Sequence, residues 1–169
     1  AFRFPGLISE SVRTLGIGPI FRLFGRWHVA LPHDLPKGPV GWVSGAAVMA
    51  RFETLQDVGF FDPAFFLYFE EADLMRRAGK AGWQTWYVPD ARVIHAEGVA
   101  TGVRGDDTQH PPRPAYWYHS WAHYFHNAKG TAGAALLGGC VLFAAGLHLA
   151  QMKLRGKPAM FPALSLIHI

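Results

Sequence analysis

The feature that most constrains the fold is an abrupt change from apolar to acidic residues near the middle of the chain. Residues 65–69 are five apolar or aromatic side chains in a row, and Glu70, Glu71 and Asp73 follow directly. A solvated surface helix usually alternates its acids with lysines and arginines four residues apart. Three carboxylates gathered where an apolar segment passes into a helix therefore indicate a site for chemistry.

The residues after this change have the spacing of a short helix. Four apolar residues share one face of a helix over 71–81, namely Leu74, Met75, Ala78 and Ala81. The three acids then occupy the helix start, where the macrodipole favours an ionised carboxylate by roughly 0.3 to 1 kcal/mol. For Asp73 this stabilisation explains the acid as well as a direct role at the site does.

Shorter elements are expected on either side. Residues 41–50 predict a buried strand whose small residues Ser44, Gly45 and Ala46 leave room for a ligand or another backbone, although a glycine in a strand also marks a bulge. The remaining segments predict helices over 8–15 and 51–58, a turn at 60–63 in which Asp62 bonds the following backbone, and strands over 83–88 and 91–95.

Composition limits the classes of protein to be considered. The chain has 169 residues, half of them apolar, which suits one domain with a core. Sixteen Lys and Arg against twelve Asp and Glu give a net charge of +4 without a long basic run, so we expect no nucleic-acid partner and weak attraction to anionic lipid or phosphate. The single Cys140 excludes a disulfide framework.

The two ends of the sequence are unusual. The chain begins at Ala1 without a methionine or a secretory signal, so we expect it to be an internal part of a longer protein. Residues 164–169 resemble the translation of an adapter used in sequencing libraries, and a genuine apolar terminus is the alternative. No element of the fold is predicted for these six residues.

The last third of the chain predicts helices. Residues 116–126 are rich in aromatics, and His119, His123 and His126 fall on one helical face. Zinc binding there would need further ligands, and an aromatic and histidine helix at a membrane or protein surface is the better interpretation. Residues 131–152 carry no charged side chain and would extend roughly 30 Å as a helix. Such a helix spans a membrane, packs on the domain or lies in the membrane interface.

Several motifs, in this order and at these spacings, resemble the C-terminal half of family 2 glycosyltransferases, and most closely their rhamnosyltransferase-like bacterial branch. They are Trp42-Val43-Ser44-Gly45-Ala46, residues 58–62, residues 66–74 with Arg77, and the segment from Gly82 to His95. The resemblance covers about residues 38–105. It implies an α/β fold, with residues 1–110 as the acceptor-side part of a GT-A Rossmann-like domain and residues 111–163 as a helical extension that is a candidate for membrane association.

The resemblance also implies the chemistry. An inverting glycosyltransferase of this family uses a carboxylate to deprotonate the acceptor hydroxyl and a divalent metal, Mn²⁺ or Mg²⁺, to neutralise the leaving diphosphate. The base falls on Glu71, where the family commonly has Asp, and His95 matches a metal-shell histidine. The remaining positions are assigned to substrate binding, with Asp73 also bracing the helix start: Trp42, Ser44, Gly45, Ala46, Glu70 and Asp73.

The implied partners are a nucleotide-sugar donor and a glycan or lipid-linked acceptor, in the synthesis of cell-surface polysaccharide at the cytoplasmic face of a bacterial inner membrane. The chain contains no Asp-x-Asp motif, so the donor site is expected upstream and the isolated chain is expected to be inactive. The alternatives are a membrane-associated scaffold or binding module that keeps the fold without the catalysis, and a small helical membrane protein with a zinc-binding histidine helix.

Overall fold

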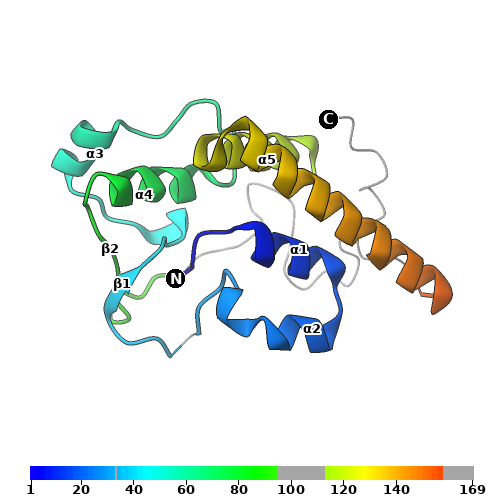
Figure 1. The fold of residues 1–169 in the computed structure, drawn as a ribbon. Helices are drawn as coiled ribbons and strands as arrows, with labels where there is room; N and C mark the ends of the chain where they lie inside the picture. The colour runs from blue at the N-terminus through cyan, green and yellow to red at the C-terminus, as the bar shows by residue number, and fades with distance from the viewer. Residues whose placement is uncertain (33, 95–112, 158–169) are drawn as a thin grey trace.

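The protein mixes helices with short strands, and the computed structural model describes residues 1–32, 34–94 and 113–157 (Figure 1). In chain order the elements are α1 (Leu7–Leu15), α2 (Gly18–Leu23), η1 (Gly25–Trp27), β1 (Gly38–Val40), η2 (Gly45–Ala47), α3 (Phe52–Val58), α4 (Glu70–Lys80), β2 (Thr85–Tyr87) and α5 (Ala115–Leu154). The helices predicted over 8–15, 51–58 and 71–81 are confirmed as α1, α3 and α4.

The sheet is small. β1 and β2 pair antiparallel, with Pro39 opposite Trp86. The strand predicted over 83–88 is confirmed in part as β2, whereas residues 91–94 are irregular and His95 lies outside the described residues. Among the described residues this is the only sheet, so a parallel Rossmann-like sheet is not seen in them.

The buried strand predicted over 41–50 is wrong. Trp42 makes only an isolated bridge to Phe2, and the chain then enters the 3₁₀ turn η2 at Gly45. Residues 44–50 are exposed. The physical reason is that a strand needs a neighbour to satisfy its backbone groups, and within the described part of the chain the pairing with Phe2 ends at Trp42.

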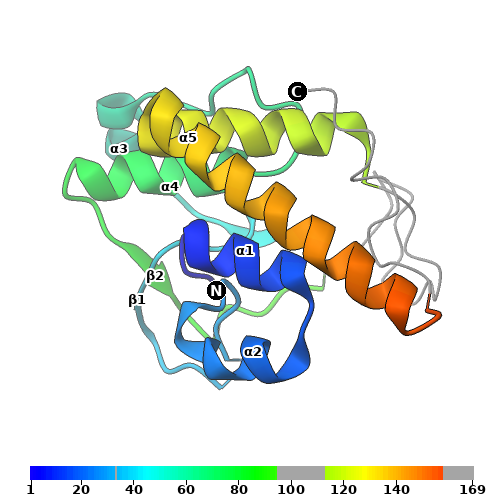
Figure 2. The same ribbon diagram turned by 45° about the vertical axis from the view of Figure 1, so that its right-hand side comes forward.

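α5 is the largest element and doubles back on itself. Gly130 has φ 71° and ψ 174°, which breaks the helix into an N-arm (residues 115–129) and a C-arm (residues 131–154). Both views show the chain reversing direction at this point (Figures 1 and 2). The reversal lets both arms contribute to one apolar core, which consists of Phe65, Ala72, Tyr124, Phe125 and Leu137.

The C-arm packs along α1 (Figure 2). His148 on the C-arm is buried, and its Nδ1 lies 3.1 Å from the carbonyl oxygen of Leu15 at the end of α1. A Cβ added at Gly16 would stand 2.9 Å from the same ring nitrogen, so only glycine fits there without a shift. The helix predicted over 131–152 therefore packs on the rest of the protein through one of its faces.

We expect Gly130→Ala to destabilise the protein by about 1–3 kcal/mol, because the φ and ψ of this residue lie in a region almost confined to glycine. The matched control is Gly139→Ala in the middle of the C-arm, where nothing stands within 4 Å of an added Cβ and helix propensity predicts a gain of roughly 0.5–1 kcal/mol. Urea unfolding of both variants measures the difference. Equal effects would contradict a bend that depends on glycine.

Candidate active site

The acids at the start of α4 follow two residues with unusual backbone angles. Tyr68 and Phe69 both have positive φ, 70° and 69°, a conformation in which a bulky side chain stores strain of order 1–3 kcal/mol. Such strain persists only where the surroundings hold it, and it gathers at functional sites. The pair turns the chain sharply into α4, so that Glu70 and Glu71 form its first two residues.

The N-arm of α5 holds this strained turn. Ser120 is buried and donates a hydrogen bond from Oγ to the carbonyl oxygen of Leu67 at 2.9 Å. The ring of Phe69 lies 5.5 Å from that of Trp117 and 5.4 Å from that of Tyr124. The aromatic N-arm, interpreted from sequence as a surface helix, thus supplies the packing that fixes the entry of α4. Positive φ at two aromatic residues leaves no signal in sequence, because glycine and asparagine normally take such positions.

Glu71 meets the small-residue segment from η2. The backbone N–H of Gly45 donates to Glu71 Oε1 at 3.1 Å, across 26 residues of sequence. A Cβ at position 45 would stand 3.4 Å from the same oxygen, which confirms how closely the two segments approach. Within the described residues no arginine or lysine pairs with Glu71, so a backbone N–H and not a cation holds its carboxylate in place.

The other predicted residues of this segment differ in what they do. Ser44 Oγ accepts a hydrogen bond from the N–H of Ala46 at 3.3 Å and so begins η2, and both residues are exposed beside Gly45. Trp42 donates from its indole N–H to the carbonyl oxygen of Arg3 at 3.0 Å and stacks on Phe2. The structure therefore brings Ser44, Gly45 and Ala46 to the carboxylate side and uses Trp42 to anchor the N-terminal segment.

Glu70 sits in a different environment from its neighbour. Its Oε2 is buried and has no hydrogen-bond partner among the described residues. Burial raises the pKa of Glu70 above its usual value. A hydrogen bond with the backbone N–H of Glu70 itself opposes this rise in part, and the adjacent Glu71 adds a smaller rise. Two neighbouring carboxylates with unlike surroundings can divide tasks, one remaining ionised while the other binds a hydroxyl.

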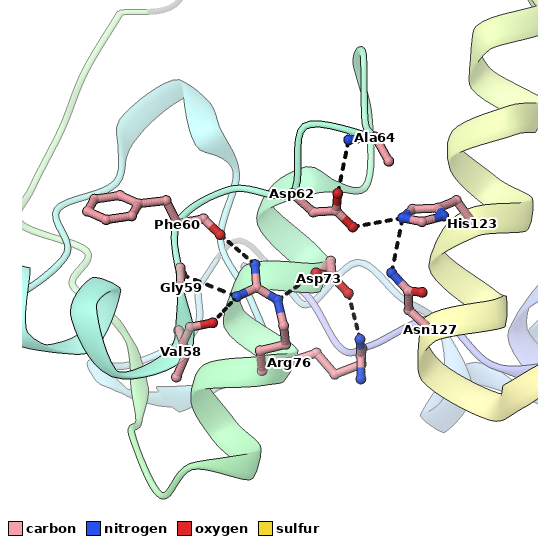
Figure 3. Close-up of polar contacts among 10 residues, drawn as sticks. Val58, Gly59, Phe60, Asp62, Ala64, Asp73, Arg76, His123 and Asn127 are labelled. Carbon is pink, nitrogen blue, oxygen red and sulfur yellow. Dashed lines mark hydrogen bonds and ion pairs between the residues drawn. The ribbon is translucent and has the colours of Figure 1, made fainter.

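Asp73 braces the helix and does not face the site. It is 1% exposed, and its two oxygens accept from Arg76 Nη2 at 2.5 Å and Arg77 Nε at 2.8 Å (Figure 3). The guanidinium of Arg77 also donates to three consecutive backbone carbonyls, those of Val58, Gly59 and Phe60. Arginines therefore occupy both oxygens of Asp73, which fits its expected role of bracing the helix start, and its assignment to substrate binding stays a prediction.

A second polar contact ties the preceding turn to the N-arm. Asp62 Oδ1 accepts from the N–H of Ala64 at 2.9 Å, which confirms the predicted turn, and Asp62 Oδ2 lies 2.8 Å from His123 Nε2 (Figure 3). The hydrogen bond with His123, then that with the backbone of Ala64, lowers the pKa of Asp62. His126 Nε2 instead lies 3.2 Å from Thr131 Oγ1, so the three-histidine face does not gather around a common point.

Metal ligands do not cluster in the part of the chain that the structure describes: no group of three His, Cys, Asp or Glu side chains there is able to hold an ion. His95, the predicted ligand, lies outside these residues.

We expect Arg77→Met to lower the free energy of unfolding by about 3 kcal/mol. The variant leaves buried Asp73 with Arg76 as its one remaining ion-pair partner in the described structure, and it removes the donors to the backbone carbonyls of residues 58–60. Lys80→Met, an exposed change on the same helix, should stay within about 0.5 kcal/mol of the parent. Urea unfolding compares the two. Similar values would show that the network contributes little to stability.

We also expect a pH-dependent effect from Glu70→Gln. Because the pKa of Glu70 is raised in the folded state, the parent protein loses stability as the pH rises from the unfolded value of about 4.5 through the folded pKa. The variant lacks this loss, so its stability relative to the parent should increase over that interval. Unfolding curves between pH 4 and 7 measure the difference, with Glu53→Gln on exposed α3 as the control. A difference that does not change with pH would contradict the assigned burial of this carboxylate.

Comparison with known proteins identifies the family. Residues 21–122 match the family described as Glycosyl transferase family group 2. The chain is 47% identical over 105 residues to the N-acetylglucosaminyl-diphospho-decaprenol L-rhamnosyltransferase of two Mycobacterium tuberculosis strains, CDC 1551 and H37Rv, a match that covers 60% of this chain and 34% of the relative. It is 38% identical over 56 residues to Rhamnosyltransferase WbbL of Escherichia coli K12, covering 33% of this chain and 21% of that protein.

The chain thus spans about a third of the length of the mycobacterial relatives it matches. No solved structure matches it. The family match covers more than half of the chain, includes α4 with both glutamates, and ends within the N-arm that holds the strained turn. This protein belongs to glycosyl transferase family group 2 and is rhamnosyltransferase-like.

Proposed function

We propose that this chain forms the acceptor side of an inverting glycosyltransferase that moves a sugar, with rhamnose as the first candidate, from a nucleotide-sugar donor to a lipid-linked glycan acceptor. The observation that carries the proposal is the pairing of Glu71 with Gly45 at the start of α4, beside a second and partly buried carboxylate. The names of the matched relatives support rhamnose and a diphospho-decaprenol acceptor.

In this proposal Glu71 is the general base. Its carboxylate takes the proton from the acceptor hydroxyl as the hydroxyl oxygen forms a bond to the anomeric carbon of the donor sugar. The bond from that carbon to the nucleotide diphosphate breaks at the same time, and the diphosphate leaves with its electron pair, so the anomeric carbon is inverted. The Gly45 N–H orients Glu71 Oε1. Glu70, whose buried Oε2 has no hydrogen-bond partner among the described residues, accepts a hydrogen bond from the acceptor.

A divalent metal, Mn²⁺ or Mg²⁺, belongs to the same proposal, and His95 is the ligand that this chain would supply. The described residues offer no complete ligand set, so the remaining ligands would come from outside them. When bound, such an ion neutralises charge on the leaving diphosphate.

The architecture and location of the enzyme follow as parts of the proposal. Residues 1–110 form the acceptor-side part of a GT-A domain, residues 111–163 extend it, and the enzyme works at the cytoplasmic face of a bacterial inner membrane, where lipid-linked acceptors are made into cell-surface polysaccharide. The coverage of about a third of each mycobacterial relative supports a donor site outside this chain. The isolated chain should accordingly give no sugar transfer.

A chimera tests the function. This chain replaces the matching segment of the mycobacterial rhamnosyltransferase, and transfer of labelled L-rhamnose to N-acetylglucosaminyl-diphospho-decaprenol is measured. We expect an active chimera whose kcat falls by about 10²–10⁴ on Glu71→Gln, because a general base contributes that much to the rate. Glu71→Asp, which restores the residue common in the family, should retain transfer.

Glu53→Gln on exposed α3 makes the same chemical change away from the site and should leave kcat unaltered. A chimera that folds and transfers rhamnose equally well with Glu71→Gln would overturn the assignment of the base. A larger loss from Glu70→Gln than from Glu71→Gln would move the base to Glu70, whose raised pKa also suits proton abstraction.

A further inference from the structure

The C-arm of α5 has two faces, and both are apolar. One face packs inward, where Leu137, Ala144, Ala145 and His148 are buried. Seven residues on the opposite face point outward and are exposed, and none is polar: Ala132, Leu136, Gly139, Phe143, Leu147, Ala150 and Leu154. Their spacing of three or four residues makes one straight stripe along the helix. Phe143 is 70% and Leu154 89% exposed.

An uncharged exposed stripe of this length is not an ordinary water-facing surface. Residues 131–152 contain no Asp, Glu, Lys or Arg, and the stripe runs for roughly 30 Å. Exposed apolar residues are common singly, but a contiguous patch marks a surface that something else covers. α5 is also the one helix in the described residues that is long and apolar enough to cross a bilayer, with 22% of its most apolar window buried.

The charges at the ends of the stripe indicate what covers it. Lys129 precedes the C-arm, Lys153 lies in its last turn, and Arg155 and Lys157 follow it. No acid occurs anywhere in residues 129–157. If the stripe packed on the same stripe of a second copy, parallel or antiparallel, the basic residues at the helix ends would lie next to each other. No acid in this segment could pair with them. Anionic lipid headgroups satisfy both ends at once, and each Lys or Arg near such a surface contributes about 1 kcal/mol.

The inward face argues against a helix that crosses the bilayer. His148 is 2% exposed and lies against the Leu15 carbonyl, and its ring fills the space over Gly16. A spanning C-arm would leave α1, exposing this polar contact and the buried Glu10 and Thr14 of α1. A helix that keeps α1 on one face and lipid on the other lies in the plane of the membrane.

We propose that the outward stripe of the C-arm is a membrane-docking surface that lies in the plane of an anionic leaflet, with Phe143 and Leu147 inserted among the acyl chains and the cations at both ends on headgroups. This goes beyond the proposed function, since it concerns a surface away from Glu71. Its test measures lipid binding, which requires no sugar transfer, so either proposal can fail without the other.

Vesicle flotation of the full chain tests the surface. On vesicles of phosphatidylglycerol and phosphatidylethanolamine, Phe143→Asp combined with Leu147→Asp should lower partitioning about tenfold or more, because two inserted apolar side chains are lost. The control is Leu23→Asp, the same change at an exposed leucine of α2 off the stripe. Unchanged partitioning of the double variant, with the unfolding midpoint of the parent, overturns the proposal.

A charge variant provides a second test. Replacing Lys153, Arg155 and Lys157 by glutamine should lower partitioning about tenfold or more on the anionic vesicles, with little effect on phosphatidylcholine. A control with the same net charge replaces three exposed cations elsewhere, Arg51, Lys80 and Arg92, and should bind as the parent does. Equal loss in both sets would show attraction by net charge alone and overturn the oriented surface.

Cysteine labelling separates an in-plane helix from a spanning one. In a Cys140→Ser background, Thr131→Cys and Lys153→Cys mark the two ends of the C-arm. In inverted inner-membrane vesicles from cells that express the chain, a membrane-impermeant maleimide should label both ends. Protection of one end would show that the helix spans the membrane. Such protection would overturn the proposal.

Light scattering without lipid tests a second copy as the occupant of the stripe. A dimer of the parent chain that Phe143→Asp abolishes would assign the stripe to that second copy and would also overturn the proposal.

Discussion

The packing of the N-arm of α5 against the entry of α4 is the contact on which the rest of the structure depends. Tyr68 and Phe69 adopt left-handed angles that their side chains disfavour, and the packing of Phe65 and Ala72 against Tyr124 and Phe125 offsets that strain. The hydrogen bond from Ser120 to Leu67 fixes the position of the turn. Without this contact, the side chains of Glu70 and Glu71 would have no fixed orientation.

The ion pair between buried Asp73 and Arg77 is the second interaction that fixes α4. Arg77 joins Asp73 to the three carbonyls at the end of α3, so one guanidinium connects a helix, a turn and the start of the next helix. Arginine suits this role because its planar fork presents several donors at fixed angles. Of the acids at the start of α4, Asp73 is thus bound by arginines, whereas Glu70 and Glu71 form no ion pair among the described residues.

The sequence predicted what is local. The apolar period and acidic start of α4 lie within eleven residues, and the Asp62 turn within three, so both could be placed without the fold. Residue pattern alone does not predict that Glu71 lies beside Gly45. Only the resemblance of the ordered motifs to the family places both residues at one site. The strand predicted at 41–50 is wrong because strand pairing depends on neighbours that are distant in sequence. The burial of Asp73 with Arg76 and Arg77 likewise depends on packing that residue type alone does not reveal. The Tyr68 and Phe69 angles left no trace in residue type.

The reversal at Gly130 has a consequence for how the protein is oriented. One arm of α5 grips the turn that aims the two glutamates, and the other arm carries the lipid-facing stripe, with one glycine between them. The angle at that glycine therefore sets the height and tilt of the carboxylates over the leaflet. Under the proposed function, the sugar of a lipid-linked acceptor would meet those carboxylates at a fixed distance from the headgroups, so the bend would set how far that sugar must protrude from the membrane.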